Sequence, residues 1–393
     1  MIASSRQRQL LVDVSIIAMH DAGTGIQRVV RSILIALFEM PPQDVEIRLV
    51  RATRKRTYVY ANQYAAALTG AEPMCDSPIT VTNGDIFLGL DLSSRIAPRR
   101  QRDFLLWRKQ GVKCAFVVYD LLPVLHPQWF TKRASRSFRR WLSTIVIHAD
   151  ALFCISRVVA TDAASHMVLT FGIDDTELKI KWFHLGTNVS SQASDLSGLD
   201  SLPSASHSEV PRELTILMVG TIEPRKGYAQ VLDAFELLWL KGVNAKLIIV
   251  GRPGWHVDEL IDRLQRHVES GKRLKWLSTA DDKELDGLYK TADGLVMASE
   301  AEGFGLPLVE ATRHGVPLLV RDLAVFREVV ADCATYFHAS NGTELARQLH
   351  CWLDALVDGS AIASNSAMPL TWRDSAAQLK HLIAQLCDLN HSN

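Results

Sequence analysis

The sequence predicts an α/β protein made of two doubly wound parallel sheets. Its 393 residues exceed the roughly 250–300 that one hydrophobic core usually supports, so we expect two domains. Strand-like and helical segments alternate in both halves of the chain, which is typical of parallel sheets covered by helices. With 48% hydrophobic and 22% charged residues, the composition is that of an ordinary globular protein and excludes wholesale disorder.

The first half, residues 1–189, opens with a strand, a glycine-containing turn and a helix. The run Leu10–Ile17 is apolar and β-branched, and a helical pattern of apolar residues begins near Gly25. Helical stretches such as Phe130–His148 separate further strand-like runs. These runs are Val45–Val50, Ile86–Leu88, Cys114–Tyr119 and Ala151–Ile155.

Residues 190–212 form a predicted linker, because eight serines and two prolines stand among few apolar residues. The alternation restarts in residues 213–371, and a last helix is predicted in residues 372–393. Ligands of such sheets bind beyond the carboxyl ends of the strands, so we expect the functional cleft between the two domains. The expected second-half elements are strands Leu214–Val219, Ala245–Val250, Leu274–Leu277, Gly294–Ala298 and Pro317–Val320 and helices Tyr228–Lys241, Val257–Ser270, Asp282–Thr291 and Pro307–His314.

The formal net charge is zero, yet it is divided unevenly. Residues 1–200 hold 24 lysines and arginines against 18 acidic residues, and the remainder holds 19 against 25. A basic face on the first half would suit phosphate, nucleic acid or an anionic membrane, although solvated helix faces explain the asymmetry equally well. No nucleic-acid recognition motif is present, so we do not expect nucleic acid as a partner.

Cysteine usage and hydropathy indicate a cytoplasmic protein. The six cysteines include no Cys-x-x-Cys pair, so we expect reduced thiols and no structural zinc. Arg6 and Arg8 precede an apolar run, but Asp13 interrupts it and no small-residue cleavage site follows, so we predict a first strand and no signal peptide. No stretch approaches the roughly 18 apolar residues that span a bilayer.

The most informative segment is SEAEGFGLPLVE at residues 299–310, directly after an apolar strand. Gly303 and Gly305 lack side chains, so their N–H groups can approach a diphosphate or a sugar closely. The helix that follows offers unpaired N–H groups and a positive dipole end to phosphates. Glu302 and Glu310 can accept hydrogen bonds from sugar and ribose hydroxyls. The two glutamates alone mean little, whereas the whole string is specific.

A second segment, VGTIEPRKG at residues 219–227, also follows a strand directly. Gly220 allows a tight exit from the strand. Arg225 and Lys226 place two cations where a departing diphosphate would develop charge, which lowers the barrier without a metal. The alternative is a surface turn with solvated basic residues.

Two looser segments lie in the first half. Residues 21–28, DAGTGIQR, contain Gly-x-Gly, but Arg28 stands where a dinucleotide fingerprint requires its third glycine, so an NAD-dependent dehydrogenase is not expected. In YDLLPVLHP, Asp120 and His126 are polar residues of an apolar run. An acceptor-side role for them is as plausible as a helix cap and a structural histidine.

The combination GTIEPRKG, IIVGRPGW and LYKTADGLVMASEAEGFGLPLVEATRHGVPLL resembles glycosyltransferase family 4, the retaining GT-B enzymes. VDVS, TGIQRVVR and CISR extend the resemblance into the first half. It implies two Rossmann-like domains facing each other across a cleft, an acceptor-binding one and a nucleotide-sugar-binding one, with the C-terminal helix crossing back to the first. It also implies a hexose donor, most plausibly GDP-mannose, for bacterial surface polysaccharide or a lipid-linked acceptor. Rhamnose, a UDP-hexose and a catalytically inactive scaffold are the alternatives.

By this resemblance, Glu302 binds donor-sugar hydroxyls and Glu310 binds the ribose, while Glu302, Arg225, Lys226 and Asp120 carry catalysis. Tyr119 departs from the family, because many relatives have His-Asp where this chain has Tyr-Asp. Tyr119 and His126 are placed on the acceptor side. The implied donor-binding residues are Gly25, Gly220, Arg225, Lys226, Arg252, Gly303, Phe304, Gly305, Leu306 and Glu310.

We expect a front-face substitution, in which the diphosphate leaves toward Arg225 and Lys226 while the acceptor hydroxyl attacks from the same side. Tyrosine is a poor base at neutral pH, which leaves Asp120 or the donor phosphate to accept the proton. No Asp-x-Asp stands in a loop suited to a metal, and the acidic pair Asp281–Asp282 fits a helix cap. No divalent cation is therefore expected.

The segment Lys132–Trp141, KRASRSFRRW, is strongly basic with aromatic edges. As a helix it would suit peripheral contact with the inner face of the cytoplasmic membrane. A basic solvent-exposed face, or a site for an anionic substrate, has equal weight.

Overall fold

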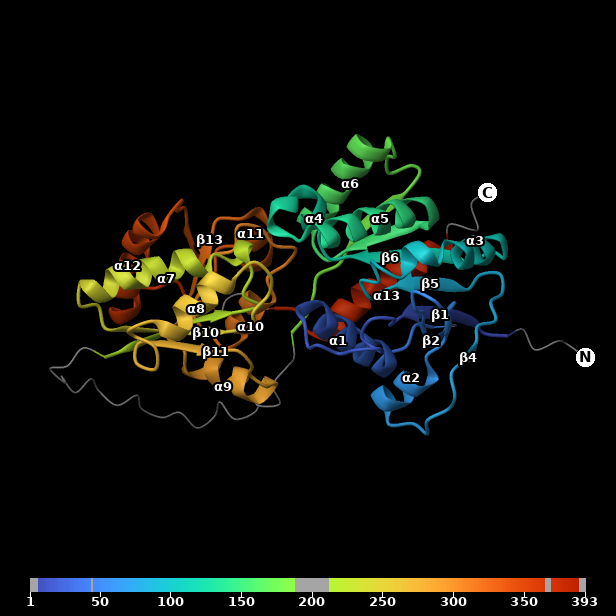
Figure 1. Cartoon of the computed structure of the whole chain (residues 1–393). Helices are drawn as coiled ribbons and strands as arrows, with labels where there is room; N and C mark the ends of the chain where they lie inside the picture. Colours follow the sequence, from blue (N-terminus) through green and yellow to red (C-terminus); the bar gives the residue numbers. More distant parts are fainter. Residues whose placement is uncertain (1–5, 44, 188–211, 365–368, 389–393) are drawn as a thin grey trace, which may run out of the picture. The chain divides into compact units, whose positions relative to one another are not determined.

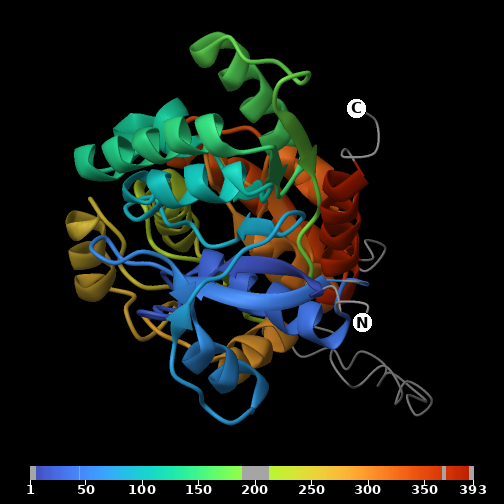
Figure 2. The ribbon, with the colours of Figure 1, turned by 90° about the vertical axis from the view of Figure 1, so that its right-hand side faces the viewer.

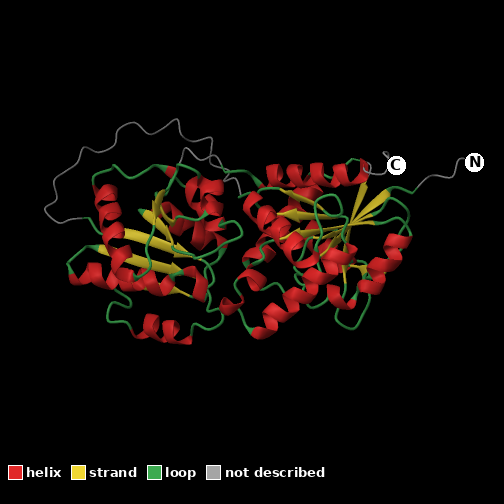
Figure 3. Ribbon diagram, turned by 90° about the horizontal axis from the view of Figure 1, so that it is seen from above, coloured by secondary structure: helices red, strands yellow, loops and turns green. Residues whose placement is uncertain are grey.

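The computed structural model describes residues 6–43, 45–187, 212–364 and 369–388. The chain divides into two compact units, each a set of strands covered by helices (Figure 3). Nearly all of the predicted linker lies outside the described residues. Unit 1 consists of Met1–Gly186, Glu302–Phe304 and Trp372–Asn393, and unit 2 consists of Thr187–Ala301 and Gly305–Thr371.

Within the described residues, one sheet of eight strands forms the centre of unit 1, in the order β4-β3-β2-β1-β5-β6-β7-β8. β1 pairs in parallel with β2 and β5, so Leu11 lies between Arg48 and Phe87. The short β3 and β4 extend this sheet antiparallel at one edge. The strands are β1 Arg8–Asp13, β2 Val45–Arg51, β3 Val59–Tyr60, β4 Ser77–Pro78, β5 Ile86–Gly89, β6 Lys113–Val118, β7 Ala151–Cys154 and β8 Lys179–Trp182.

Capped amphipathic helices cover this sheet. Thr24 begins α1 with a capping box that includes Gln27, and α3 and α5 pack side by side (Figure 2). Beneath α3, the rings of Phe87 and Phe104 lie 5.2 Å apart in the core. The helices are α1 Gly25–Glu39, α2 Asn62–Thr69, α3 Gln101–Lys109, α4 Leu122–Leu125, α5 Lys132–His148, α6 Arg157–Phe171 and α13 Trp372–Asp388, with 3₁₀ turns Ala97–Arg99 and Pro127–Trp129.

The C-terminal helix α13 belongs to unit 1 and packs against α1 (Figure 1). Lys380 Nζ donates to the Met40 carbonyl at 2.9 Å, at the end of α1. Gln378 Oε1 accepts from the His184 amide at 2.9 Å, after β8. The last helix of the chain is therefore part of the first unit's structure.

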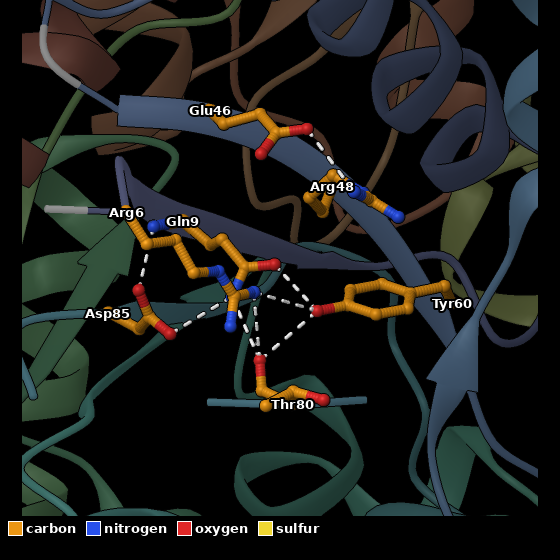
Figure 4. Close-up of polar contacts among 7 residues, drawn as sticks. All are labelled: Arg6, Gln9, Glu46, Arg48, Tyr60, Thr80 and Asp85. Carbon is orange, nitrogen blue, oxygen red and sulfur yellow. Dashed lines mark hydrogen bonds and ion pairs between the residues drawn. The ribbon is translucent and has the colours of Figure 1, made fainter. Parts of the chain in front are cut away.

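A polar cluster closes the amino-terminal edge of the unit 1 sheet (Figure 4). The Tyr60 hydroxyl donates to Gln9 Oε1 at 2.6 Å, and Gln9 Nε2 donates to Asp85 Oδ2 at 3.0 Å. Arg6 donates to the Thr80 carbonyl at 3.0 Å. These bonds join Tyr60, the last residue of the antiparallel β3, to the amino-terminal parts of β1 and β5, so the cluster is structural.

Every described pairing in unit 2 is parallel, in a sheet of order β11-β10-β9-β12-β13-β14. The strands are β9 Leu214–Val219, β10 Ala245–Val250, β11 Leu274–Leu277, β12 Gly294–Met297, β13 Leu318–Arg321 and β14 Thr335–Phe337. The helices are α7 Tyr228–Leu240, α8 Asp258–Arg266, α9 Asp282–Thr291, α10 Leu306–Arg313, α11 Ala324–Val330 and α12 Gly342–Val357, with the 3₁₀ turn η3 Pro224–Lys226.

One expected helix is shorter than predicted. α8 ends at Arg266 and not at Ser270. His267 Nε2 lies 2.8 Å from Glu236 Oε1, and His267 Nδ1 lies 3.1 Å from the Glu269 amide, which donates to it. The histidine ring thus ties the chain to α7 and to the following turn, where the helix stops. The predicted cap of α9 is confirmed, because Asp281 accepts from the Glu284 amide at 2.7 Å.

Candidate functional site

The two most informative sequence segments lie side by side at the carboxyl edge of the unit 2 sheet. β9 and β12 are neighbouring parallel strands, so the turn after β9 and the loop after β12 leave the sheet together. The Glu300 amide donates to the Arg225 carbonyl at 2.7 Å. Arg225 Nη1 donates to the Ala301 carbonyl at 2.8 Å. Backbone and side chain of one residue therefore join segments 75 positions apart.

Glycines allow this close approach. Gly227 has φ +72°, and a Cβ atom there would lie 2.4 Å from the Ala298 carbonyl oxygen. A Cβ atom on Gly251 would lie 1.8 Å from the Gly220 carbonyl oxygen. Since real Cβ atoms do not come so close, only glycine fits where β9, β10 and β12 end.

The two predicted cations differ in their surroundings. The Arg225 side chain is 11% exposed, and its Nε lies 3.0 Å from Glu223 Oε2 in an ion pair. The half-buried Lys226 has its ammonium over the turn that leaves β9, because a Cβ atom on Gly220 would lie 3.9 Å from Lys226 Nζ. Arg225 thus supports the adjoining loop, while Lys226 directs its charge over the end of the strand.

The loop 302–305 leads into α10. Glu302–Phe304 group with unit 1, where Ser156 Oγ donates to the Gly303 carbonyl at 2.9 Å. Gly305 caps α10 with φ +104°, a left-handed conformation that favours glycine. Leu306 begins the helix, Pro307 has no N–H, and the Leu308 amide already donates to the Gly305 carbonyl at 2.9 Å, so this helix start attracts an anion mainly through its positive dipole end.

Glu310 lies on α10 and is held by a residue that the sequence did not single out. The buried Tyr289 on α9 donates its hydroxyl to Glu310 Oε2 at 2.8 Å. Tyr289 stacks on His314, with the rings 5.6 Å apart and 7° from parallel. Burial lowers the pKa of His314, although Asp286 opposes this. In the sequence, Tyr289 is one of the apolar positions of a predicted helix. No sequence pattern therefore predicts its hydrogen bond with Glu310.

Arg252 follows β10, and its side chain is exposed. Its carbonyl accepts from the Ile222 amide at 2.8 Å, so its loop borders the turn after β9. Gly25 is the first residue of α1, with open space around its Cβ position. The glycine that this turn requires is Gly23, at φ +62°.

The polar residues predicted for the acceptor side lie at the carboxyl edge of the unit 1 sheet. Tyr119 donates its hydroxyl to the Leu90 carbonyl at 2.8 Å, and burial raises its pKa well above the usual value. Asp120 Oδ1 accepts from the Leu122 amide at 3.0 Å, at the start of α4. His126 stacks on Trp129 with ring centres 4.3 Å apart. Tyr119 therefore stays protonated at neutral pH.

A buried acidic pair at this edge was not predicted as a site. Asp91 Oδ2 accepts from the amides of Ile16 and Ile17 at 2.7 and 2.8 Å. Asp13 accepts from the Ser15 amide at 2.9 Å. Burial, and then the charge of Asp13, raise the pKa of Asp91 to about 7. The two carboxylates shape the turn between β1 and α1.

The basic segment Lys132–Trp141 forms most of α5, but its aromatic residues do not edge a surface. Phe138 and Trp141 are 4% and 1% exposed and belong to the unit 1 core. The cationic side chains are exposed and form no ion pair with any described residue. We call them the α5 basic face: Lys132, Arg133, Arg136, Arg139 and Arg140.

The described residues contain neither a membrane-spanning helix nor a cluster of metal ligands. No helix there is long and apolar enough to cross a membrane. Among the same residues, no group of three or more histidine, cysteine, aspartate or glutamate side chains is arranged to hold a metal ion.

Residues 204–355 match the family model described as "Glycosyl transferases group 1". Apart from Glu302–Phe304, the matched residues belong to unit 2. The chain is 37% identical over 378 residues to the Escherichia coli protein "Serotype-specific mannosyltransferase WbdA", covering 95% of this chain and 46% of that protein. It therefore spans about half the length of this relative. A "Phosphatidyl-myo-inositol mannosyltransferase" of Mycolicibacterium smegmatis is 34% identical over 125 residues, 31% of each protein.

Solved structures share the fold of this chain. Anabaena HepE in complex with UDP and glucose has a TM-score of 0.62 at 15% identity, covering 96% of this chain and 98% of that chain. Sucrose-phosphate synthase from Thermosynechococcus elongatus has a TM-score of 0.64 at 15% identity, covering 96% and 99%. At these identities the likeness concerns the fold alone. The predicted GT-B fold class is confirmed.

Proposed function

We propose that the chain is a retaining hexosyltransferase of glycosyltransferase family 4 that transfers mannose from GDP-mannose to a growing surface polysaccharide or a lipid-linked acceptor. One observation carries this proposal: Arg225 joins the turn that bears Lys226 to the loop that leads to Glu302, at the carboxyl edge of one parallel sheet. The similarity to WbdA and to other mannosyltransferases supports mannose as the sugar.

In this proposal the donor diphosphate lies against Lys226 and the amino terminus of α10. The ammonium over Gly220 and the positive dipole end of α10 both favour negative charge. Glu310 receives the ribose hydroxyls while Tyr289 holds its other side. Glu302 accepts hydrogen bonds from the sugar hydroxyls. Negative charge builds up on the diphosphate as its bond to the sugar breaks.

The transfer step we propose is a front-face substitution. The bond between the anomeric carbon and the diphosphate oxygen breaks, and a bond to the acceptor hydroxyl oxygen forms on the same face. Lys226 stabilises the departing diphosphate. The acceptor proton moves to a diphosphate oxygen or to Asp120. Tyr119 cannot accept it, since its hydroxyl is already protonated and donates to Leu90.

No divalent cation takes part in the proposed mechanism. Lys226 and the α10 amino terminus supply the positive charge that a metal would otherwise bring to the diphosphate, and Arg225, paired with Glu223, holds the loop beside them. Activity in excess EDTA tests this directly, and a loss of turnover that manganese restores would contradict it.

We further propose peripheral contact of the α5 basic face with the inner surface of the cytoplasmic membrane. Each basic residue near an anionic surface contributes about 1 kcal/mol, so five aligned cations suffice for reversible binding. Binding by charge, without aromatic insertion, predicts strong weakening by salt. Co-sedimentation with vesicles containing phosphatidylglycerol tests it, with R136E/R139E/R140E as the comparison. Equal sedimentation of the variant and the wild-type chain would contradict this role.

The donor is identified by binding and then by transfer. A ligand that binds the native state raises the melting temperature, so GDP should stabilise the chain more than UDP or dTDP. Transfer from GDP-mannose should then give a product whose NMR spectrum shows the donor's anomeric configuration. Stabilisation by UDP or dTDP alone would make the mannose assignment wrong. No response to any nucleotide, and no transfer, would refute the transferase proposal.

A further inference from the structure

β13 ends in an arginine that contacts three separate segments at the carboxyl edge of the unit 2 sheet. Arg321 Nε donates to the Ala298 carbonyl at 3.1 Å, and Arg321 Nη1 donates to the Ala339 carbonyl at 2.9 Å. Its Nη2 donates to Gln230 Oε1 on α7. The guanidinium also lies over the Phe337 ring, 5.1 Å from its centre. One side chain thus connects the ends of β12 and β14 with α7.

A charged group in this half-buried place has an energetic cost. Burial lowers the pKa of Arg321, and the nearby charge of Glu300 only partly opposes this. An apolar side chain would pack there without losing hydration. A planar guanidinium, in contrast, fixes the directions of several N–H groups at once, which neither lysine nor an apolar residue does. An arginine at this position therefore indicates that the orientation of the bonded carbonyl groups matters more here than apolar packing.

The Ala298 carbonyl is confined from two sides. Arg321 Nε contacts it, and Gly227 approaches so closely that a Cβ atom there would lie 2.4 Å from the oxygen. Three residues on, Arg225 Nη1 holds the Ala301 carbonyl, and between them the Glu300 amide is bonded to the Arg225 carbonyl. The segment Ala298–Ala301 is thus fixed at both ends by arginines. Glu302 follows immediately.

We propose that Arg321 is a positioning residue for the transfer reaction: with Arg225 it fixes the segment Ala298–Ala301 and so sets the place of Glu302. In this role Arg321 acts through the segment that it holds, and its own contacts are with Ala298, Ala339, Gln230 and Phe337. This inference rests on the proposed function, because it assigns a purpose to a loop that would bind the donor sugar. It also adds a residue that the sequence motifs did not include, since Arg321 lies beyond the glycine-rich segment.

The experiment compares R321K and R321M with R327K. Arg327 is the matched control, because it also stacks on an aromatic ring, Tyr336, and pairs with Asp322, but at an exposed site. Hydrogen exchange of the Glu300 amide reports the loop without any need for turnover. Steady-state kinetics with GDP-mannose give kcat and KM, and GDP binding and the melting temperature are measured on the same samples.

We expect the Glu300 amide to exchange at least about tenfold faster in R321K than in the wild type. We expect kcat to fall by on the order of 10–100-fold, because small displacements of positioned groups have effects of this size. GDP affinity and melting temperature should stay near wild-type values in R321K, and R327K should match the wild type throughout.

Unchanged Glu300 exchange and unchanged kcat in folded R321K and R321M would overturn the proposal. If both variants unfold, Q230L removes one acceptor of Arg321 more gently, and it should give the same changes at smaller size. Unfolding of all three variants would assign Arg321 to the packing of unit 2 and overturn the positioning role. The wild-type chain could transfer no sugar while the Glu300 amide still exchanges faster in R321K than in the wild type. The proposed function would then be wrong, but Arg321 would still be shown to hold the segment Ala298–Ala301.

Discussion

Replacing Gly227 by alanine tests how tightly the two segments of the candidate site are packed. Two costs add at this position. An L residue at φ +72° costs about 1–2 kcal/mol relative to glycine. The new Cβ would lie 2.4 Å from the Ala298 carbonyl oxygen, and forced repacking of this kind costs about 1–3 kcal/mol. We therefore expect Gly227→Ala to destabilise unit 2 by about 2–5 kcal/mol.

Gly242→Ala is the matched control, because Gly242 has φ +82° and nothing within 4 Å of its Cβ position. It should carry only the backbone cost of about 1–2 kcal/mol. Hydrogen exchange of β10 amides gives the free energy of opening for unit 2 separately from unit 1. The difference between the two variants measures the contact with Ala298. Equal destabilisation would refute the close packing of the turn after β9 against the loop after β12.

Three further predictions follow from the described contacts. Tyr289→Phe removes a hydroxyl donor to Glu310, so the KM for GDP-mannose should rise about 3–10-fold with kcat unchanged; an unchanged KM would contradict the role of Glu310 in donor binding. Asp91 has a pKa raised to about 7, so its contribution to stability is present near pH 4 and is lost as the pH rises to 7. In Asp91→Asn, the fall in stability between pH 4 and pH 7, measured by thermal melting, should therefore be smaller by up to about 4 kcal/mol. The same pH profile in the variant and the wild type would contradict this contribution of Asp91. Transfer activity should be unaffected by excess EDTA.

The alternation of strands and helices was predictable because parallel strands buried on both faces are continuous apolar runs. β9, β10 and β11 have the predicted bounds for this reason. β3 and β4 contain two residues each and pair antiparallel, so no periodicity identified them. α8 ends early because of the contacts of His267, which depend on α7. The domain boundaries and the linker stay predictions.

The motif residues could be found in the sequence, but their contacts could not. Arg225 can donate to the Ala301 carbonyl because β9 and β12 are neighbours in the sheet. Neither sequence segment predicts this strand order. Tyr289 and Arg321 reach the site from a helix and a strand end with no motif around them. Their roles arise from packing. The catalytic and binding roles of Glu302, Lys226 and Asp120 stay predictions.

Lys226→Met is the most direct test of a single donor site formed by the turn after β9 and the loop after β12. The control is Lys241→Met, an exposed lysine that follows α7 in the same unit. Transfer of labelled mannose from GDP-mannose should fall by on the order of 100–1,000-fold in kcat/KM for Lys226→Met, since one preorganised charge at a developing anion has this effect. Lys241→Met should match the wild type. Wild-type kcat/KM in a folded Lys226→Met chain would contradict the placement of the diphosphate at this turn.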